Sequence, residues 1–201
     1  MQIVVSTTHG KDYDALASIV VPNHIEYCRK NGYEYNIHHA TFKGESTYSN
    51  SYLIYVKEIL KYYDIICTID LDLLFMNFNI KIEDIFPSDK GQQIAQENLG
   101  GCTHNAGVVL WRNVPSTYLL LEEIFNRRAH YEKHCMNWQG QICDHIMHKN
   151  PVINEMNIVK ENVMNSFPIN FKDNDFILHT YCFAYTDKIK VLNEYLKRVV
   201  K

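Results

Sequence analysis

The segment IICTIDLDLLFMN, from Ile65 to Asn77, places two aspartates between two apolar runs. The first run predicts a buried strand over Ile65–Ile69, so that Asp70 and Asp72 follow at its carboxyl end. An unpaired buried carboxylate is costly, and such groups are therefore paired, neutralised or bound to a metal. Ligands of open α/β sheets also gather at the carboxyl ends of the strands. This segment therefore marks a candidate functional site.

Three interpretations of the Asp70-Leu71-Asp72 motif follow from the residues alone. In the first, both carboxylates hold a divalent cation, because residues two apart on a regular strand point the same way and oxygen ligands suit Mg²⁺ or Mn²⁺. In the second, Asp70 is a nucleophile, as in phosphatases of the haloacid dehalogenase type, although Leu74 stands where those enzymes carry Thr or Val. In the third, the aspartates cap a turn or pair with nearby Lys or Arg side chains.

The surrounding chain alternates between strand and helix patterns, which predicts an α/β sandwich with a largely parallel sheet. Strands are predicted over 3–8, 33–39, 65–69, 92–97, 106–112 and 176–180, and helices over 12–30, 52–63, 115–131, 138–148 and 187–200. Pro22 is expected to kink or split the first helix, and Gly32 to cap it. The 201 residues show no internal repeat and no Gly-, Pro- or Ser-rich linker, so we expect one domain over 1–201.

Composition excludes several classes of function. The formal net charge of −3 argues against bulk nucleic-acid binding, which requires a strongly basic balance. The sequence contains no stretch of about 18 uncharged apolar residues, so it predicts no membrane span. The six cysteines form no C-x-x-C pair, and we interpret them as core residues of a reduced protein. Since the amino-terminal segment also lacks the pattern of a signal peptide, we expect a cytoplasmic location.

Four blocks occur in a characteristic order: KEILKYYDIICTIDLDLLFMN, NAGVVLWRN, WQGQICDHI and FILHT. Together they resemble nucleotide-sugar glycosyltransferases of the GT-A fold. They are most similar to the galactosyl/xylosyl/mannosyl transferase family of fungi and plants, glycosyltransferase family thirty-four, and to small viral and bacterial proteins of that pattern. The resemblance implies a GT-A sandwich that moves a sugar from a nucleotide-diphosphate donor, UDP being favoured, to a saccharide or glycan hydroxyl.

The resemblance also implies a metal centre and a donor site. Asp70 and Asp72 match the D-x-D motif that holds Mn²⁺ or Mg²⁺ on the donor diphosphate, with Leu71 between them, and His179 matches the histidine that completes the metal site. Imidazole is a suitable Mn²⁺ ligand beside carboxylates.

Four further residues match the donor side of the family pattern. Lys57 occupies the position of a lysine that reaches toward the donor, although a solvated helix charge explains it equally well. Thr7 and Thr8 end the first strand, where GT-A enzymes seat the nucleoside, and Tyr13 follows where a ring would pack on the base.

The sugar and acceptor side matches the NAG block. Asn105, Ala106 and Gly107 correspond to residues that line this side in the family, and Gly107 also permits a close backbone approach. Resemblance favours retention of configuration, which needs no dedicated base because the departing phosphate takes the proton. Inversion would require a carboxylate near the acceptor, for which Glu97 and Asp144 are the candidates.

Two blocks depart from the family pattern. In WQGQICDHI, the neighbours of Gln139 are Trp138 and Gly140, whereas the family carries an acidic residue beside this glutamine. Gln139 is therefore the residue expected near the anomeric carbon, and Asp144 is the nearest carboxylate. The missing acidic residue leaves open a nucleotide-sugar binding module without activity. The glycine that follows the late histidine in the family is also absent, which weakens the assignment of a diphosphate-binding lysine to Lys188 or Lys190.

Overall fold

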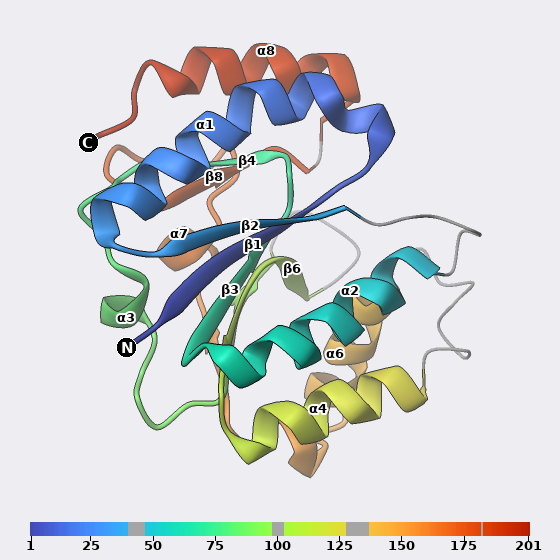
Figure 1. The fold of residues 1–201 in the computed structure, drawn as a ribbon. Helices are drawn as coiled ribbons and strands as arrows, with labels where there is room; N and C mark the ends of the chain where they lie inside the picture. Colours follow the sequence, from blue (N-terminus) through green and yellow to red (C-terminus); the bar gives the residue numbers. More distant parts are fainter. Residues whose placement is uncertain (40–46, 98–102, 128–136, 182) are drawn as a thin grey trace.

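Six strands form the central sheet of the computed structural model, in the order β2-β1-β3-β6-β5-β7. Figure 1 labels β2, β1, β3 and β6 of this sheet. The structure describes residues 1–39, 47–97, 103–127, 137–181 and 183–201. The strands are β1 (Ile3–His9), β2 (Glu34–His39), β3 (Ile65–Ile69), β5 (Gln92–Gln96), β6 (His104–Arg112) and β7 (Met156–Val159). Sequence reasoning missed β7, whose four residues show no clear apolar alternation.

The sheet is largely parallel, as predicted, and β6 is the strand that runs against its neighbours. It pairs antiparallel with β3 and with β5, whereas β1 pairs parallel with β2 and β3, and β5 with β7. The reversal brings the start of β6 to the carboxyl end of β3. Ile69 pairs with Val108, and the Asp70 N–H donates to the Gly107 carbonyl at 2.7 Å. The NAG block therefore lies beside the aspartates.

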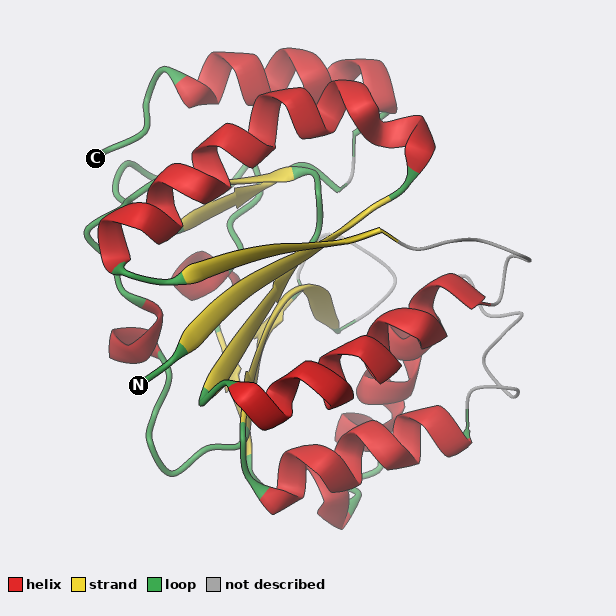
Figure 2. Ribbon diagram, viewed as in Figure 1, coloured by secondary structure: helices red, strands yellow, loops and turns green. Residues whose placement is uncertain are grey.

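Helices cover both faces of this sheet (Figure 2). α1 (Asp14–Asn31) and α8 (Tyr185–Leu196) lie together on one face, and α2 (Thr47–Ile59), α4 (Pro115–Asn126) and α6 (Asn137–Met147) on the other (Figure 1). The short elements are η1 (Lys11–Tyr13), η2 (Leu60–Tyr62), η3 (Pro151–Ile153), α3 (Ile82–Ile85) and α7 (Glu161–Met164).

A second, two-stranded sheet lies on the α1 side and extends the aspartate segment. β4 (Leu73–Phe75) pairs antiparallel with β8 (Ile177–His179), and Leu73 is the register partner of His179. The apolar run after the aspartates is thus a strand of its own, which the sequence analysis did not assign. Because of this register, the late histidine lies next to the residue that follows Asp72.

Helix boundaries differ from the predicted ones in ways that have local causes. α1 begins after a 3-10 turn, and it continues through Pro22 without being split. Gly32 ends it in the left-handed conformation at φ 73°, with its N–H bonded to the Cys28 carbonyl, as a glycine cap should. α4 ends at Asn126, and the predicted extension over 128–131 lies outside the described residues. α8 occupies Tyr185–Leu196 instead of 187–200.

Apolar side chains alternate between the two sheet faces, as the period of a strand requires. Val5 and Cys67 pack with Tyr27 of α1, whereas Val4 and Ile66, one residue earlier in each strand, pack against the α2 and α4 side. The core of the central sheet therefore has one apolar layer on each face, and the strand ends that carry polar residues lie between these layers.

The described cysteines form no disulfide. Cys28 and Cys67 are buried, and the half-buried Cys143 donates from its Sγ to the His104 carbonyl at 3.7 Å, while Cys102, Cys135 and Cys182 lie outside the described residues. Among the described helices, none has the length and apolar character needed to span a membrane.

Candidate metal centre

Asp70 and Asp72 converge from a turn between β3 and β4, not from a regular strand. β3 ends at Ile69 and β4 begins at Leu73. We expected the two carboxylates to point the same way because they would lie on a regular strand. The carboxylates do lie together, but a turn and not a strand positions them. The side chain of Leu71 leaves the site and packs with the apolar cluster around Leu16.

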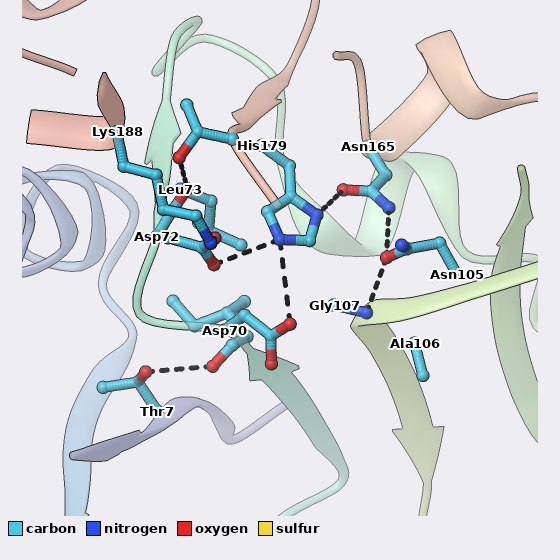
Figure 3. A network of polar contacts seen from close by, with 12 residues as sticks. Thr7, Asp70, Asp72, Leu73, Asn105, Ala106, Gly107, Asn165, His179 and Lys188 are labelled. Carbon is cyan, nitrogen blue, oxygen red and sulfur yellow. Dashed lines mark hydrogen bonds and ion pairs between the residues drawn. The ribbon is translucent and has the colours of Figure 1, made fainter. Parts of the chain in front are cut away.

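His179 completes a cluster with the two aspartates (Figure 3). Its Nε2 atom lies 3.1 Å from Asp72 Oδ1 and 3.7 Å from Asp70 Oδ2. One ligand atom from each of the three residues lies within 4.8 Å of the others. His179 and Asp72 are buried, while Asp70 faces the solvent side. Two carboxylate oxygens and one imidazole nitrogen form a donor set that could hold a divalent metal ion.

Lys188 of α8 adds a positive charge to this cluster. Its Nζ atom lies 2.5 Å from Asp72 Oδ2. Burial alone would raise the pKa of Asp72, but His179 and Lys188 hold it well below its usual value. Burial alone would lower the pKa of His179, but Asp72 and Asp70 raise it above its usual value. Lys188, together with His179 when it is protonated, thus offsets negative charge of the two carboxylates, a charge that a divalent cation could also offset.

Three side chains fix the backbone of the aspartate turn by donating to its carbonyl groups. The Thr7 hydroxyl donates to the Ile69 carbonyl at 2.9 Å, and the Thr180 hydroxyl to the Asp72 carbonyl at 2.8 Å. His24 Nε2 lies 3.0 Å from the Leu73 carbonyl. The Asp72 carbonyl also accepts the Thr180 backbone N–H at 3.0 Å, so side-chain and backbone donors together hold this turn. Thr7, expected to seat a nucleoside, uses its hydroxyl to anchor β3.

The NAG block of β6 forms the neighbouring wall. Asn105 Oδ1 accepts the Gly107 N–H at 2.8 Å, and the Ala106 N–H donates to Gln139 Oε1 at 2.8 Å. Gly107 lies directly against His179, because a Cβ placed on it would come within 2.2 Å of His179 Cε1. The structure therefore brings Asn105, Ala106, Gly107 and Gln139 to the site.

Solved structures match this architecture. A glycosyltransferase involved in the glycosylation of the major capsid of PBCV-1 matches with a TM-score of 0.79 at 12% identity, over 96% of this chain and 100% of that one. The galactosyltransferase LgtC, solved with donor and acceptor sugar analogs, matches with a TM-score of 0.56 at 12% identity, over 100% of this chain and 97% of that one. The chain has the GT-A fold.

The GT-A assignment rests on structure, since no family sequence model and no curated protein sequence matches the chain. Mouse xyloside xylosyltransferase 1 also matches, with a TM-score of 0.53 at 11% identity over 90% of this chain and 97% of that one. The predicted GT-A sandwich is confirmed. At these identities the likeness establishes the fold, and the subfamily suggested by the sequence blocks stays a prediction.

Three further predicted residues, Glu97, Thr8 and Tyr13, have contacts of their own in the GT-A fold. Glu97 is buried and accepts from Asn105 Nδ2 at 3.1 Å and from the Tyr181 hydroxyl. Thr8 lies one residue before the end of β1, opposite its register partner His38. Tyr13 is half exposed and meets Tyr185 edge to face at 5.9 Å.

Lys57 and Asp144 are not part of the acidic cluster. Lys57 Nζ is paired with Glu122 Oε1 of α4 at 2.7 Å and lines a groove between α2 and α4. Asp144 lies half-buried on α6, one turn beyond Gln139. Among the described His, Cys, Asp and Glu side chains, the group able to share a metal consists of Asp70, Asp72 and His179.

Sequence reasoning missed Asn165 and left Lys188 in doubt. Asn165 is fully buried, and its Oδ1 atom lies 3.0 Å from His179 Nδ1. It sits in the segment MNSFP, which carries no periodic or motif signal. Lys188 and Lys190 share one helix, but Lys190 pairs with Asp187 in solvent while Lys188 reaches Asp72. Side chains two residues apart on a helix point in different directions, so Lys188 and Lys190 lie on different faces of α8.

Proposed function

We propose that this chain is a metal-dependent glycosyltransferase that uses a nucleotide-diphosphate sugar, with UDP favoured, and transfers the sugar to a saccharide or glycan hydroxyl with retention of configuration. The observation that carries the proposal is the meeting of Asp70, Asp72 and His179 at the carboxyl end of β3 in a GT-A fold. We further propose that residues 1–201 form one catalytic domain and that the protein works in the cytoplasm, as the cysteine pattern suggests.

The residues fit a divalent cation. The carboxylates of Asp70 and Asp72 would supply two ligands, and the neutral form of His179 would offer Nε2 as a third ligand. A cation held there supplies positive charge to a diphosphate leaving group. The two carboxylate oxygens suit Mn²⁺ or Mg²⁺, and the cluster of Asp70, Asp72 and His179 contains no thiolate that would select a softer metal.

Lys188 could bind the donor diphosphate once a cation neutralises the charge of Asp72. Its ammonium would then be released from Asp72 Oδ2 while remaining at the rim of the same site. A positive charge at that point stabilises negative charge that develops on a departing phosphate. We therefore place Lys188, rather than Lys190, on the donor diphosphate.

The sugar and acceptor side would be formed by β6 and the start of α6. Asn105, Ala106 and Gly107 line it, and Gln139 is fixed against Ala106 by its side-chain oxygen. Glu97 is engaged by two donors and is buried, which suits a structural carboxylate better than a general base. This engagement supports retention, in which the leaving phosphate accepts the acceptor proton.

The test is calorimetric titration of UDP and of GDP, each with and without Mn²⁺. Wild type should bind one of the two nucleotides only when Mn²⁺ is present, and Asp72→Asn should lose that binding. Asp173→Asn is the matched control, since Asp173 is exposed and pairs with Arg198. Nucleotide binding that ignores Mn²⁺, or that survives in Asp72→Asn, would contradict the donor site.

A panel of nucleotide sugars then separates the transferase from the two other readings of the sequence. Transfer to a saccharide, or slow hydrolysis of one donor, supports an enzyme. Metal-dependent binding without turnover of any donor would indicate a binding module. Release of phosphate from a sugar phosphate, with no need for a nucleotide, would indicate the phosphatase chemistry.

A further inference from the structure

A buried chain of hydrogen bonds leads from the β6 backbone to Nδ1 of His179, the ring nitrogen that faces away from the aspartates (Figure 3). The Gly107 N–H lies 2.8 Å from Asn105 Oδ1, and Asn165 Nδ2 lies 2.8 Å from the same oxygen. Asn165 Oδ1 then lies 3.0 Å from His179 Nδ1. Asn105, Asn165 and His179 are all buried. We call Gly107 N–H, Asn105 and Asn165 the amide relay.

The direction of every bond in the amide relay is fixed from its outer end. A backbone N–H is only a donor, so the Asn105 atom that faces Gly107 is the carbonyl oxygen. The Glu97 carboxylate is only an acceptor when ionised, which fixes the Asn105 amide nitrogen on the opposite side. Asn165 must therefore present its NH₂ group to Asn105, and its oxygen is left facing His179.

This order determines which nitrogen of His179 carries the proton. Since Asn165 presents an oxygen, Nδ1 must be the N–H donor. In the neutral imidazole the lone pair is then on Nε2, the atom that faces Asp70 and Asp72. Without that acceptor, the proton of a neutral His179 could lie on Nε2 and bond to Asp72, and no nitrogen lone pair would face the site.

We propose that Asn165 and Asn105 are positioning residues that hold His179 in the Nδ1–H tautomer, ready to bind a cation through Nε2. The proposal rests on the metal centre of the proposed function but not on its sugar chemistry. It also gives Asn105 a role other than lining the sugar side. Partners of this kind in known sites change metal affinity by about 10–100-fold when they are removed.

Three variants test the relay through Mn²⁺ affinity, measured without nucleotide by calorimetry or by the electron spin resonance of free Mn²⁺. Asn165→Leu removes the acceptor and should weaken Mn²⁺ binding by about 10–100-fold. Asn165→Asp keeps an acceptor for Nδ1–H but faces Asn105 Oδ1 with a second acceptor. It should lower thermal stability while its Mn²⁺ affinity stays closer to wild type than to Asn165→Leu.

Asn23→Leu is the matched control. Asn23 is also buried and makes two bonds, to the Phe75 carbonyl and from the Phe75 N–H, but it does not touch His179. It should cost stability and leave Mn²⁺ affinity unchanged. If Asn165→Leu does not fold, Asn165→Ala takes its place with the same expected loss.

Equal Mn²⁺ affinity in Asn165→Leu and wild type, or an equal loss of affinity in Asn165→Asp and Asn165→Leu, would overturn the proposal. Weakened Mn²⁺ binding in Asn165→Leu alone, in a protein that transfers no sugar, would support the relay and contradict only the proposed reaction.

Discussion

Gly107 on β6 and His179 on β8 are in contact so close that no side chain fits between them. A Cβ at Gly107 would lie 2.2 Å from His179 Cε1 and 2.8 Å from His179 Nδ1. The two residues are 72 positions apart in sequence, and they meet because β6 runs against β3 while β8 pairs with β4. Because glycine has no Cβ, the backbone at Gly107 leaves room for the imidazole ring of a candidate metal ligand.

Gly107→Ala should displace the His179 ring and impair the metal centre. The methyl group overlaps a buried ring whose Nδ1 is held by Asn165, so the ring must move by about an ångström, a displacement that can cost about 100-fold in activity. Mn²⁺ affinity and donor turnover are the measurements. Gly91→Ala is the control, since its Cβ would also meet an atom at 2.6 Å, the Ser116 hydroxyl, outside the site. Unchanged Mn²⁺ binding in Gly107→Ala would show that the ring does not need this position.

Lys188→Gln should strengthen the binding of Mn²⁺ alone and weaken the binding of nucleotide diphosphate with Mn²⁺. The ammonium competes with a cation for Asp72 Oδ2, and a hydrogen bond to a charged group contributes about 1.5–3 kcal/mol, or about 10–100-fold in affinity. The same ammonium is proposed to contact the diphosphate. Titrations of Mn²⁺, and of nucleotide at saturating Mn²⁺, measure the two effects separately.

Lys190→Gln serves as the control for this pair of titrations, because Lys190 lies on the same helix and pairs with Asp187 in solvent. It should leave both affinities near wild type. Equal effects of the two substitutions would indicate general electrostatic attraction instead of a specific position for Lys188.

His24 should make the folded protein less stable as the pH falls from about 6.5 to about 4. Burial lowers the pKa of His24 to about 4, against the opposing bond to the Leu73 carbonyl. Between these pH values the unfolded chain binds a proton that the folded chain does not, so the free energy of unfolding decreases by about 3 kcal/mol toward the acidic end. Above pH 6.5 the contribution is constant.

Denaturant unfolding of wild type and His24→Gln across this pH range measures the effect. The variant should show a flatter dependence, since its amide can still donate to the Leu73 carbonyl but does not titrate. His148→Gln, at an exposed position, should retain the wild-type slope. An identical slope in His24→Gln and wild type would assign the acid sensitivity to other groups.

Lys57→Gln should change donor affinity by less than twofold and cost less than about 1 kcal/mol of stability, as exposed ion pairs do. The structure gives its ammonium a partner in Glu122, on the groove between α2 and α4. Nucleotide titration and denaturant unfolding check both parts, with Lys61→Gln, which breaks the exposed pair with Glu58, as control. A marked loss of nucleotide affinity in Lys57→Gln alone would restore the donor role inferred from resemblance.

Residues adjacent in sequence account for what could be predicted here. The strand Ile65–Ile69 and the placement of Asp70 and Asp72 at its end follow from a local apolar run, and the structure contains that strand with those bounds. His179 was found through a motif and its order in the chain. Leu71 illustrates the limit, because it lies within the motif and yet packs its side chain in the core.

The sequence by itself determined the fold class and the identity of the three residues that form the cluster, because local periodicity and motif order are written in neighbouring residues. Only the tertiary structure decided what surrounds them. Lys188 on Asp72 and Asn165 on His179 are contacts across 116 and 14 positions, and the amide relay passes from residue 107 to residue 179 through residue 165. Such contacts depend on strand register and on the reversal of β6, which no local pattern specifies, because residues distant in sequence meet only through the way the two sheets are paired.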